Sequence, residues 1–409
     1  MKIWLLTIGE PIPQDGDKTR LLRTGQFAKW LADNGHDVTF INSSFDHYKK
    51  EQRFEKSTTL EVKSNYRIVC LYGRSYTKTI SLKRFMSHVD IANSFRSWLH
   101  DDVPEAPDII LASYPIEELC RAALQYAKPL GIAVVIDCRD FWPDIFAERL
   151  PKIMQKLGPL IFYPFEKRAR ETLGHADALV GMTESALKWG CNKARRPRRE
   201  EDIIFPFTYE KGKTPRVSTQ TLQSLDGKLS IVFFGTLSYR IDLDLFVRAS
   251  AKLPDEYKKK IVFRIAGDGD QLDILKKLAD ELNAPFEFFG WIEKPQITEL
   301  LASADLGLLP YSRTDFHLTL PNKFSEYLSG STPVFSCTDG EVKKFLNNHG
   351  CGVWVRPDEE EITLMLKNLI ENGIPENSKH NSKIAFEKNF APNIVFPTTL
   401  EKLQKLVTH

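Results

Sequence analysis

Short apolar runs alternate with longer segments of helical periodicity through the first half of the chain. Each run is bounded by Gly, Pro or polar residues, which is typical of a strand buried on both faces. Strands that alternate with helices in this way build a parallel sheet covered by helices. The pattern therefore predicts a doubly wound, Rossmann-like α/β domain over residues 1–207. Its expected strands are Ile3–Ile8, Val38–Ile41, Ile68–Leu71, Asp108–Ala112, Ala133–Asp137 and Ala176–Val180.

The alternation restarts after residues 208–228, which are rich in Thr, Ser, Gln, Lys and Gly and are expected to form a linker. A second doubly wound domain is predicted over residues 229–395. The last helical segment, about 396–409, is expected to pack back on the first domain. The second domain has expected strands at Ser230–Phe234, Ile261–Ala266, Phe286–Phe289, Leu306–Leu309 and Pro333–Ser336, with helices at 242–252, 271–282, 295–302 and 322–329.

Composition excludes several classes of protein but does not identify the function. The formal net charge of the 409 residues is +2, which is too small to indicate a nucleic-acid partner, although the first half is the more basic one. The six cysteines are widely spaced, and no run approaches the roughly 18 apolar residues that span a bilayer. Asp242-Leu243-Asp244 has the letters of a metal-binding Asp-x-Asp motif but opens a helix. We therefore expect a cytoplasmic protein with reduced thiols, no metal and no cofactor.

In open parallel sheets, ligands bind beyond the carboxyl ends of the strands, so we expect the site between the two domains. The loop Gly9–Asp17 leaves the first strand and enters a helix, where free amide groups suit an anion. Gly16 and Asp17 in this loop, with Arg23 on the helix, are candidates for contacting a phosphate or the acceptor. A plain tight turn and a solvated helix arginine are the alternatives.

Gly267-Asp268-Gly269 also joins a strand to a helix. The third glycine of a GxGxxG dinucleotide fingerprint is replaced by Leu272, and two aspartates would repel a pyrophosphate. NAD binding is therefore not expected.

The segment from Pro321 to Glu326 begins a helix after a buried strand and a polar loop. Unpaired amides at a helix start favour phosphate. Lys323 and Glu326 are three positions apart and share one helix face, so the lysine could neutralise a diphosphate while the carboxylate accepts ribose hydroxyls. An ordinary surface salt bridge between the two is the alternative.

The order of several motifs resembles the retaining glycosyltransferases of family 4. The helix with Glu326 is followed by Ser329-Gly330-Ser331-Thr332-Pro333-Val334, close to the small-Gly-x-Pro-Val signature of that family. The resemblance implies a GT-B fold and, in detail, the branch that builds bacterial surface polysaccharides. Further matching stretches are Gly35-His36-Asp37-Val38-Thr39, Ser44-Phe45-Asp46-His47-Tyr48, Arg139-Asp140-Phe141-Trp142-Pro143-Asp144, Phe234-Gly235-Thr236-Leu237, Gly267-Asp268-Gly269 and Phe289-Gly290-Trp291-Ile292.

The resemblance implies a donor site in the second domain. Glu326 would hold the ribose, Lys323 and the loop ending at Leu320 the diphosphate, and Gly290 to Ile292, including Trp291, the base. Gly235 and Gly267 belong to the same donor set by motif position.

The chain departs from the family pattern at two points. The first of two glutamates, eight positions before Glu326, falls on Leu318, and Asp315 is the candidate substitute. The usual Arg and Lys of the glycine motif fall on Thr236 and Ile241, which leaves Arg240 and Lys323 as the nearest basic residues.

The first domain offers Arg139 and Asp140 as catalytic candidates after the strand Ala133–Asp137. Asp140 could hydrogen-bond the acceptor or sugar, and Arg139 could hold a phosphate; a structural ion pair is the alternative. Trp142 is either a rigid aromatic wall for a sugar or a core residue.

Residues 151–170 combine apolar side chains with five Lys or Arg residues, and Pro159 and Pro164 interrupt any single helix. With Lys78, Lys83 and Arg84, this segment could rest on an anionic membrane, the alternative being a buried helix face with a solvated rim.

Together these features predict an enzyme that transfers a sugar from a nucleotide-sugar, with UDP the expected nucleotide, to a lipid-linked or glycan acceptor in cell-envelope polysaccharide synthesis. The resemblance implies that the reaction retains configuration, and no metal is expected. A sugar-nucleotide epimerase and a non-catalytic nucleotide-sugar-binding relative are the alternatives.

Overall fold

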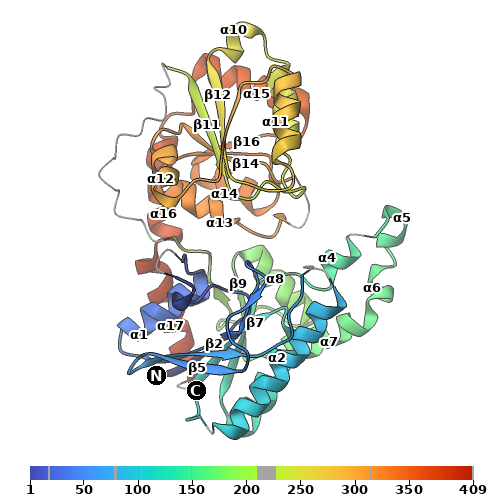
Figure 1. The fold of residues 1–409 in the computed structure, drawn as a ribbon, viewed down its shortest axis with the longest axis vertical. Helices are drawn as coiled ribbons and strands as arrows, with labels where there is room; N and C mark the ends of the chain where they lie inside the picture. Colours follow the sequence, from blue (N-terminus) through green and yellow to red (C-terminus); the bar gives the residue numbers. More distant parts are fainter. Residues whose placement is uncertain are drawn as a thin grey trace. The chain divides into compact units, whose positions relative to one another are not determined.

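The computed structural model describes residues 1–16, 19–77, 81–102, 104–148, 150–209, 227–312 and 316–407. The chain divides into two compact units: unit 1 comprises Met1–Phe205 and Phe396–His409, and unit 2 comprises Pro206–Val395. Most of the expected linker, residues 210–226, lies outside the described residues. Each unit is built on a mainly parallel sheet with helices packed on it (Figure 1), which confirms the expected fold class.

Unit 1 contains an eight-stranded sheet with the order β10-β9-β8-β7-β1-β2-β6-β5. Its neighbours are parallel except β5, which runs antiparallel to β6. All six expected apolar runs form strands. The strands are β1 (Lys2–Leu6), β2 (Asp37–Ser43), β5 (Thr58–Lys63), β6 (Tyr66–Leu71), β7 (Ile109–Tyr114), β8 (Ala133–Cys138), β9 (Ala178–Gly181) and β10 (Ile203–Ile204).

Four strands of unit 1 were not expected, and one of them is β10 at an edge of the sheet. The edge strand β5 alternates half-buried and exposed positions, so it lacks the continuous apolar run that marks the inner strands. Strands β3 (Phe45–Asp46) and β4 (Glu51–Gln52) form a two-residue antiparallel ladder beside the main sheet.

The helices of unit 1 follow the expected alternation. They are α1 (Arg23–Asp33), α2 (Leu82–Asp101), α3 (Glu117–Ala127), α4 (Asp144–Ala147), α5 (Lys152–Gln155), α6 (Gly158–Ile161), α7 (Tyr163–Gly174) and α8 (Glu184–Lys193), with the 3-10 turns η1 (Pro13–Asp15) and η2 (Lys128–Leu130). Pro159 and Pro164 stand in the first turns of α6 and α7, so the expected interruption of residues 151–170 by proline is confirmed.

The carboxyl-terminal helix α17 (Pro392–Val407) lies beside α1 (Figure 1). The Phe396 ring is 5.3 Å from Phe27 and 6.2 Å from Phe205, measured between ring centroids. Lys402 at the other end of the helix donates to the carbonyl of Glu200 at 2.8 Å. Aromatic packing therefore attaches the end of the chain to unit 1.

Unit 2 contains a six-stranded, all-parallel sheet with the order β13-β12-β11-β14-β15-β16. The strands are β11 (Leu229–Phe234), β12 (Ile261–Ala266), β13 (Phe286–Gly290), β14 (Leu306–Leu309), β15 (Val334–Ser336) and β16 (Gly352–Trp354). The helices are α9 (Leu243–Ala251), α10 (Asp255–Lys258), α11 (Leu272–Glu281), α12 (Lys294–Ala302), α13 (Asn322–Ser329), α14 (Glu341–His349), α15 (Glu359–Asn372) and α16 (Ser378–Asn389).

Successive residues of β11 enter two different hydrophobic clusters. Val232 packs with residues of α12, α13 and α16, whereas Ile231 and Phe233 pack with residues of α9, α11 and α15. Because neighbouring strand residues point to opposite faces, helices cover both sides of this sheet. That is the doubly wound arrangement that the apolar runs predicted.

Candidate functional site

Three glycine-containing loops meet at the carboxyl edge of the sheet in unit 2. The amide of Gly235, after β11, donates to Ala266 at 2.9 Å, and the amide of Gly267, after β12, donates to Gly290 at 2.6 Å. Gly267 has φ +137°, and a Cβ atom there would lie 1.8 Å from the carbonyl oxygen of Gly235. Only glycine allows this approach, so the loops meet through their backbones.

The same requirement explains the remaining glycine of the Gly-Asp-Gly stretch. Leu237 donates its amide to Asp268 at 2.8 Å, and a Cβ atom on Gly269 would lie 2.1 Å from the Leu237 carbonyl. These glycines therefore let two backbone segments touch, which accounts for the pattern without a dinucleotide.

Helix α13 points a lysine at these loops. Tyr327 anchors the helix, because its buried hydroxyl donates to Leu308 at 3.0 Å and its ring fills the space beside Gly307. One helical turn earlier, Lys323 extends over Gly235, with its Nζ 2.5 Å from the point that a Cβ on Gly235 would occupy. The absence of a side chain on Gly235 thus makes room for the ammonium group.

Glu326 shares the helix with Lys323 but is only 4% exposed. This carboxylate is therefore not a surface group, and the choice between ribose binding and pairing with Lys323 stays a prediction. Pro321 precedes the helix and offers no side-chain cap to the amides of the first turn. Lysine, helix start and glycine loops together form a surface suited to an anion, with a carboxylate one turn away.

The other residues that were expected to bind the donor differ from Lys323 and Glu326 in their surroundings. Arg240 is exposed, with its guanidinium 5.2 Å from the Phe316 ring centroid, and Trp291 is 77% exposed. Ile292 packs partly against the core. The side chain of Leu320 packs in the same core, so a contact between this residue and the diphosphate would be made by its backbone. Asp315 lies outside the described residues.

A buried network of four charges lies at the carboxyl edge of the sheet in unit 1. Arg139, after β8, is ion-paired with Glu10, after β1, and its Nη1 also donates to the Thr7 hydroxyl at 3.1 Å. Arg23 of α1 is ion-paired with Asp137 of β8. Burial lowers the pKa of Arg139, but the carboxylates of Glu10 and Asp137 outweigh that effect and raise it above its ordinary value. Two positive and two negative groups thus balance one another away from water.

This network supports the alternative of a structural ion pair for Arg139. It also shows that the solvated-arginine interpretation of Arg23 is wrong, because that side chain is wholly buried and donates to Asp137 and to the carbonyl of Phe205. A burial of this kind leaves Arg23 no surface to offer an acceptor, so its place among the phosphate and acceptor candidates is also corrected.

The start of α1 already has an anion from the chain itself. The Glu10 carboxylate accepts the Gly25 amide at 3.2 Å, which is where a ligand phosphate was expected to bind. Gly16 stands at the exposed end of η1, and Asp17 lies outside the described residues. In the described part of this loop, Glu10 therefore binds groups of the protein itself, whereas the expected role of Gly16 and Asp17 stays a prediction.

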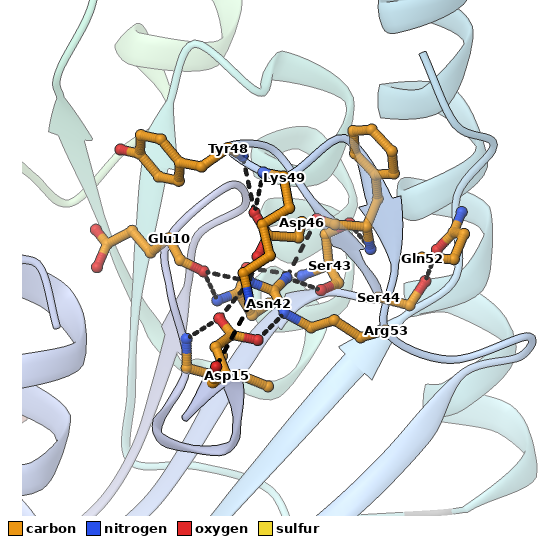
Figure 2. A network of polar contacts seen from close by, with 12 residues as sticks. Glu10, Asp15, Asn42, Ser43, Ser44, Asp46, Tyr48, Lys49, Gln52 and Arg53 are labelled. Atoms are coloured by element: carbon orange, nitrogen blue, oxygen red, sulfur yellow. Dashed lines mark hydrogen bonds and ion pairs between the residues drawn. The ribbon is translucent and has the colours of Figure 1, made fainter. Parts of the chain in front are cut away.

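Figure 2 shows how Arg53 joins this loop to the loop after β2. Its Nε and Nη2 donate to the two carboxylate oxygens of Asp15 at 2.6 and 2.7 Å. Its Nη1 donates to the carbonyls of Ser43 and Phe45, and Asp46 lies within 3.4 Å. Burial opposes ionisation of Asp15, yet the hydrogen bonds from Arg53 and from a backbone amide lower its pKa.

Asp140 and Trp142 lie just beyond the buried network. Asp140 is exposed directly after β8. Trp142 is half-buried, and its ring stacks on His88 with a centroid distance of 6.0 Å. Trp142 is therefore neither wholly in the core nor freely exposed.

No role was predicted from the sequence for Glu10, Asp137, His88 or Arg53. Glu10 stands in Gly-Glu-Pro immediately after the first strand, and that position was the available signal. The pairings could not be seen, because Arg23 and Asp137 are 114 positions apart and Arg139 and Glu10 are 129 apart. Within the described ranges, no group of three or more His, Cys, Asp or Glu side chains is arranged to hold a metal ion, and no helix is long and apolar enough to cross a bilayer.

Comparisons with known proteins agree with this architecture. Residues 228–372, within unit 2, match the family described as "Glycosyl transferases group 1". An uncharacterized glycosyltransferase of Methanocaldococcus jannaschii, MJ1607, is 28% identical over 134 residues, and the match covers 32% of this chain and 33% of that protein. The putative colanic acid biosynthesis glycosyl transferase WcaI of Escherichia coli is 21% identical over 83% of this chain and 85% of its own.

Solved structures show the same fold over the whole chain. Sucrose-phosphate synthase from Thermosynechococcus elongatus has a TM-score of 0.75 with 13% identity, covering 100% of this chain and 99% of its own. HepE from Anabaena, in complex with UDP-glucose, has a TM-score of 0.63 with 14% identity, and the match covers 99% of this chain and 100% of HepE. The fold is therefore GT-B, and the family match over unit 2 together with the relatives supports a glycosyltransferase.

Proposed function

We propose that the protein transfers a sugar from a nucleotide-sugar, with UDP the expected nucleotide, to an acceptor in cell-envelope polysaccharide synthesis. The reaction would retain anomeric configuration and proceed without a divalent metal. The observation that carries this proposal is the Lys323 ammonium group over Gly235, inside the segment that matches the glycosyl transferase family. HepE, a neighbour of the same fold, was solved with UDP-glucose, which supports the choice of nucleotide.

In the proposed mechanism, the glycine loops and the first-turn amides of α13 receive the diphosphate. Lys323 lies where negative charge accumulates on the leaving phosphate as the bond to the sugar breaks, so its cation stabilises the transition state. Glu326 accepts hydrogen bonds from the ribose, and the exposed ring of Trp291 is placed to stack on the base. Asp140 of unit 1 is the candidate group for the acceptor or the transferred sugar.

A nucleotide-release assay tests the activity. Purified protein is incubated with UDP-, GDP-, dTDP- and CMP-sugars, with and without membrane-lipid extract, in the presence of EDTA. Release from one donor that depends on the extract and persists in EDTA is the expected result. Binding of nucleotide without release from any donor would instead support a non-catalytic relative.

Two substitutions test the donor site by calorimetry with UDP. Glu326→Ala is expected to weaken UDP binding, because a charge-assisted hydrogen bond contributes about 1.5–3 kcal/mol. Lys323→Met is expected to weaken binding and to lower kcat, since the ammonium acts on the leaving group. Lys277→Met, at an exposed lysine of α11, is the matched control. Unchanged UDP affinity in both site variants would refute these roles.

We also propose that the acceptor is lipid-linked and that unit 1 rests on an anionic membrane through residues 151–165, called here the apolar arm. Ile153 is 88% exposed and Leu160 is 74% exposed, values far above those of ordinary helix side chains facing a core. Lys156 and Lys167 are exposed beside them, so the surface suits anionic headgroups. The likeness to WcaI, a putative colanic acid glycosyl transferase, supports a surface-polysaccharide role.

Vesicle flotation tests the arm. Phosphatidylcholine vesicles that contain phosphatidylglycerol should bind the protein, and pure phosphatidylcholine vesicles should bind it less. Replacing Ile153 and Leu160 by serine should reduce the bound fraction several-fold. The same change at Ile274 and Leu364, two exposed apolar residues of unit 2, is the control. Equal binding of both double variants would exclude the arm.

A further inference from the structure

Cationic and aromatic side chains gather at the start of α2 in unit 1. The Nζ of Lys50 lies 5.1 Å from the centroid of the Tyr76 ring, and the guanidinium of Arg84 lies 6.0 Å from the same centroid. Arg84 is also 5.6 Å from the centroid of Trp142. Two cations therefore share one aromatic platform beyond the carboxyl edge of the sheet.

Two neutral histidines complete this cluster. The Nδ1 of His47 is 2.7 Å from the Tyr76 hydroxyl and 3.4 Å from Lys50. His88 is 1% exposed, and neither of its ring nitrogens has a hydrogen-bond partner. Burial, together with the positive charge of Arg84, lowers the pKa of His47 to about 4 and that of His88 to about 3. The cluster thus has a positive potential and an unsatisfied polar ring.

The backbone holds Lys50 in an unusual conformation to place it there. Its φ is +60°, a left-handed value that is uncommon outside glycine, and its amide donates to Asp46 at 2.9 Å. The Asp46 carboxylate is turned to other partners, because it accepts the amides of Tyr48 and Lys49 and approaches Arg53. In the described part of the chain, Lys50 therefore contacts rings rather than a carboxylate.

The cluster adjoins the apolar arm. Leu82 and Met86 are both exposed, but each is two positions from Arg84 and therefore lies on the opposite side of α2. The Phe85 ring lies 6.4 Å from the ring of Phe165 at the end of the arm. A ligand that joins an anionic group to an apolar chain would contact both surfaces at once.

We propose that Lys50, Arg84, His47 and Tyr76 form a subsite for the phosphate or diphosphate group of the lipid acceptor. The acceptor role rests on the proposed function, whereas the anion binding does not. A phosphate oxygen would accept charge-assisted hydrogen bonds from the two cations, which are about twice as strong as neutral ones. The apolar chain attached to that phosphate would continue along Phe85 and Phe165 toward the arm.

Calorimetry with farnesyl diphosphate, inorganic diphosphate and farnesol tests this subsite. All titrations use the full chain in the Lys323→Met background with saturating UDP, so that the donor site cannot report a diphosphate. Lys50→Gln and Arg84→Gln are each expected to weaken farnesyl diphosphate binding about 10-fold, a loss of one charge-assisted contact. Lys49→Gln and Lys83→Gln remove exposed neighbouring charges and should change the affinity less than 2-fold. If the Lys50→Gln variant does not fold, Lys50→Met serves as the second variant at this position.

The ligands separate the possible sources of the anion. Tighter binding of farnesyl diphosphate than of inorganic diphosphate, with no binding of farnesol, supports a lipid phosphate. Equal affinity for the two diphosphates would overturn the lipid part of the proposal and leave an anion subsite. Equal losses in the site variants and their controls would overturn the subsite itself. Sugar transfer that fails while the subsite variants behave as expected would count against the proposed function alone.

Discussion

Replacing Glu10 by glutamine perturbs the buried charge network most directly. Glu10 and Arg139 form an ion pair whose side chains are 3% and 16% exposed, and Arg23 and Asp137 balance each other beside it. The substitution keeps the size of the side chain but leaves two arginines against one carboxylate. The Gly25 amide at the start of α1 also loses its charged acceptor.

The expected loss of stability is large. Removing one partner of a buried ion pair costs about 3–5 kcal/mol, because the remaining charge stays away from water without compensation. For a unit of this size, each 1 kcal/mol lowers Tm by about 2–4 °C. Glu10→Gln should therefore lower the Tm of the transition that reports unit 1 by roughly 6–20 °C.

Thermal unfolding followed by circular dichroism and by calorimetry measures this loss. Glu55→Gln, at an exposed glutamate of the same unit, is the control and should leave Tm unchanged. The double variant Glu10→Gln with Arg139→Gln removes both charges and should recover at least half of the loss. A Tm shift within that of the Glu55 control, or no recovery in the double variant, would refute the reasoning.

Two further predictions concern acid stability and the glycine loops. Hydrogen bonds from Arg53 hold the pKa of Asp15 below its ordinary value of 3.8 against the opposing effect of burial, so its contribution is complete above that pH and is lost as pH falls through the lower, folded value. The difference in Tm between wild type and Asp15→Asn should therefore shrink as pH is lowered toward 2, and a constant difference would argue against it. Gly267→Ala should abolish UDP binding, because its Cβ would strike the Gly235 carbonyl. Gly373→Ala, at the end of α15 and with nothing within 4 Å of the new Cβ, is the control: it should lower the stability of unit 2 by about 1–2 kcal/mol for its positive φ and leave UDP affinity unchanged. Calorimetry showing equal UDP affinity in the two glycine variants would contradict the proposed role of the loops.

Strand positions were predictable because a strand that is buried on both faces is a continuous run of apolar residues. Every expected apolar run became a strand of the expected sheet. The edge strand β5 has no such run, since only alternate positions are covered by protein. The short β16 was missed as well, and its three residues are only half-buried.

The donor candidates were partly visible for a similar reason. Lys323 and Glu326 are three positions apart on a helix, so their common face follows from local geometry alone. The place of the Lys323 amine over Gly235 did not follow, because it depends on how α13 packs against Gly307 through Tyr327. The buried state of Glu326 was decided by the same packing.

The sequence by itself determined two doubly wound α/β domains and the interruption of residues 151–170 by proline, because periodicity and backbone chemistry act over a few neighbouring residues. Only the tertiary structure decided which charges pair. The residues next to Arg23 and Arg139 in the sequence do not distinguish them from surface arginines. Both are nevertheless neutralised by carboxylates more than 100 positions away. The energy of a buried charge depends on that distant partner, and a partner so far along the chain is brought near only when the sheet has formed.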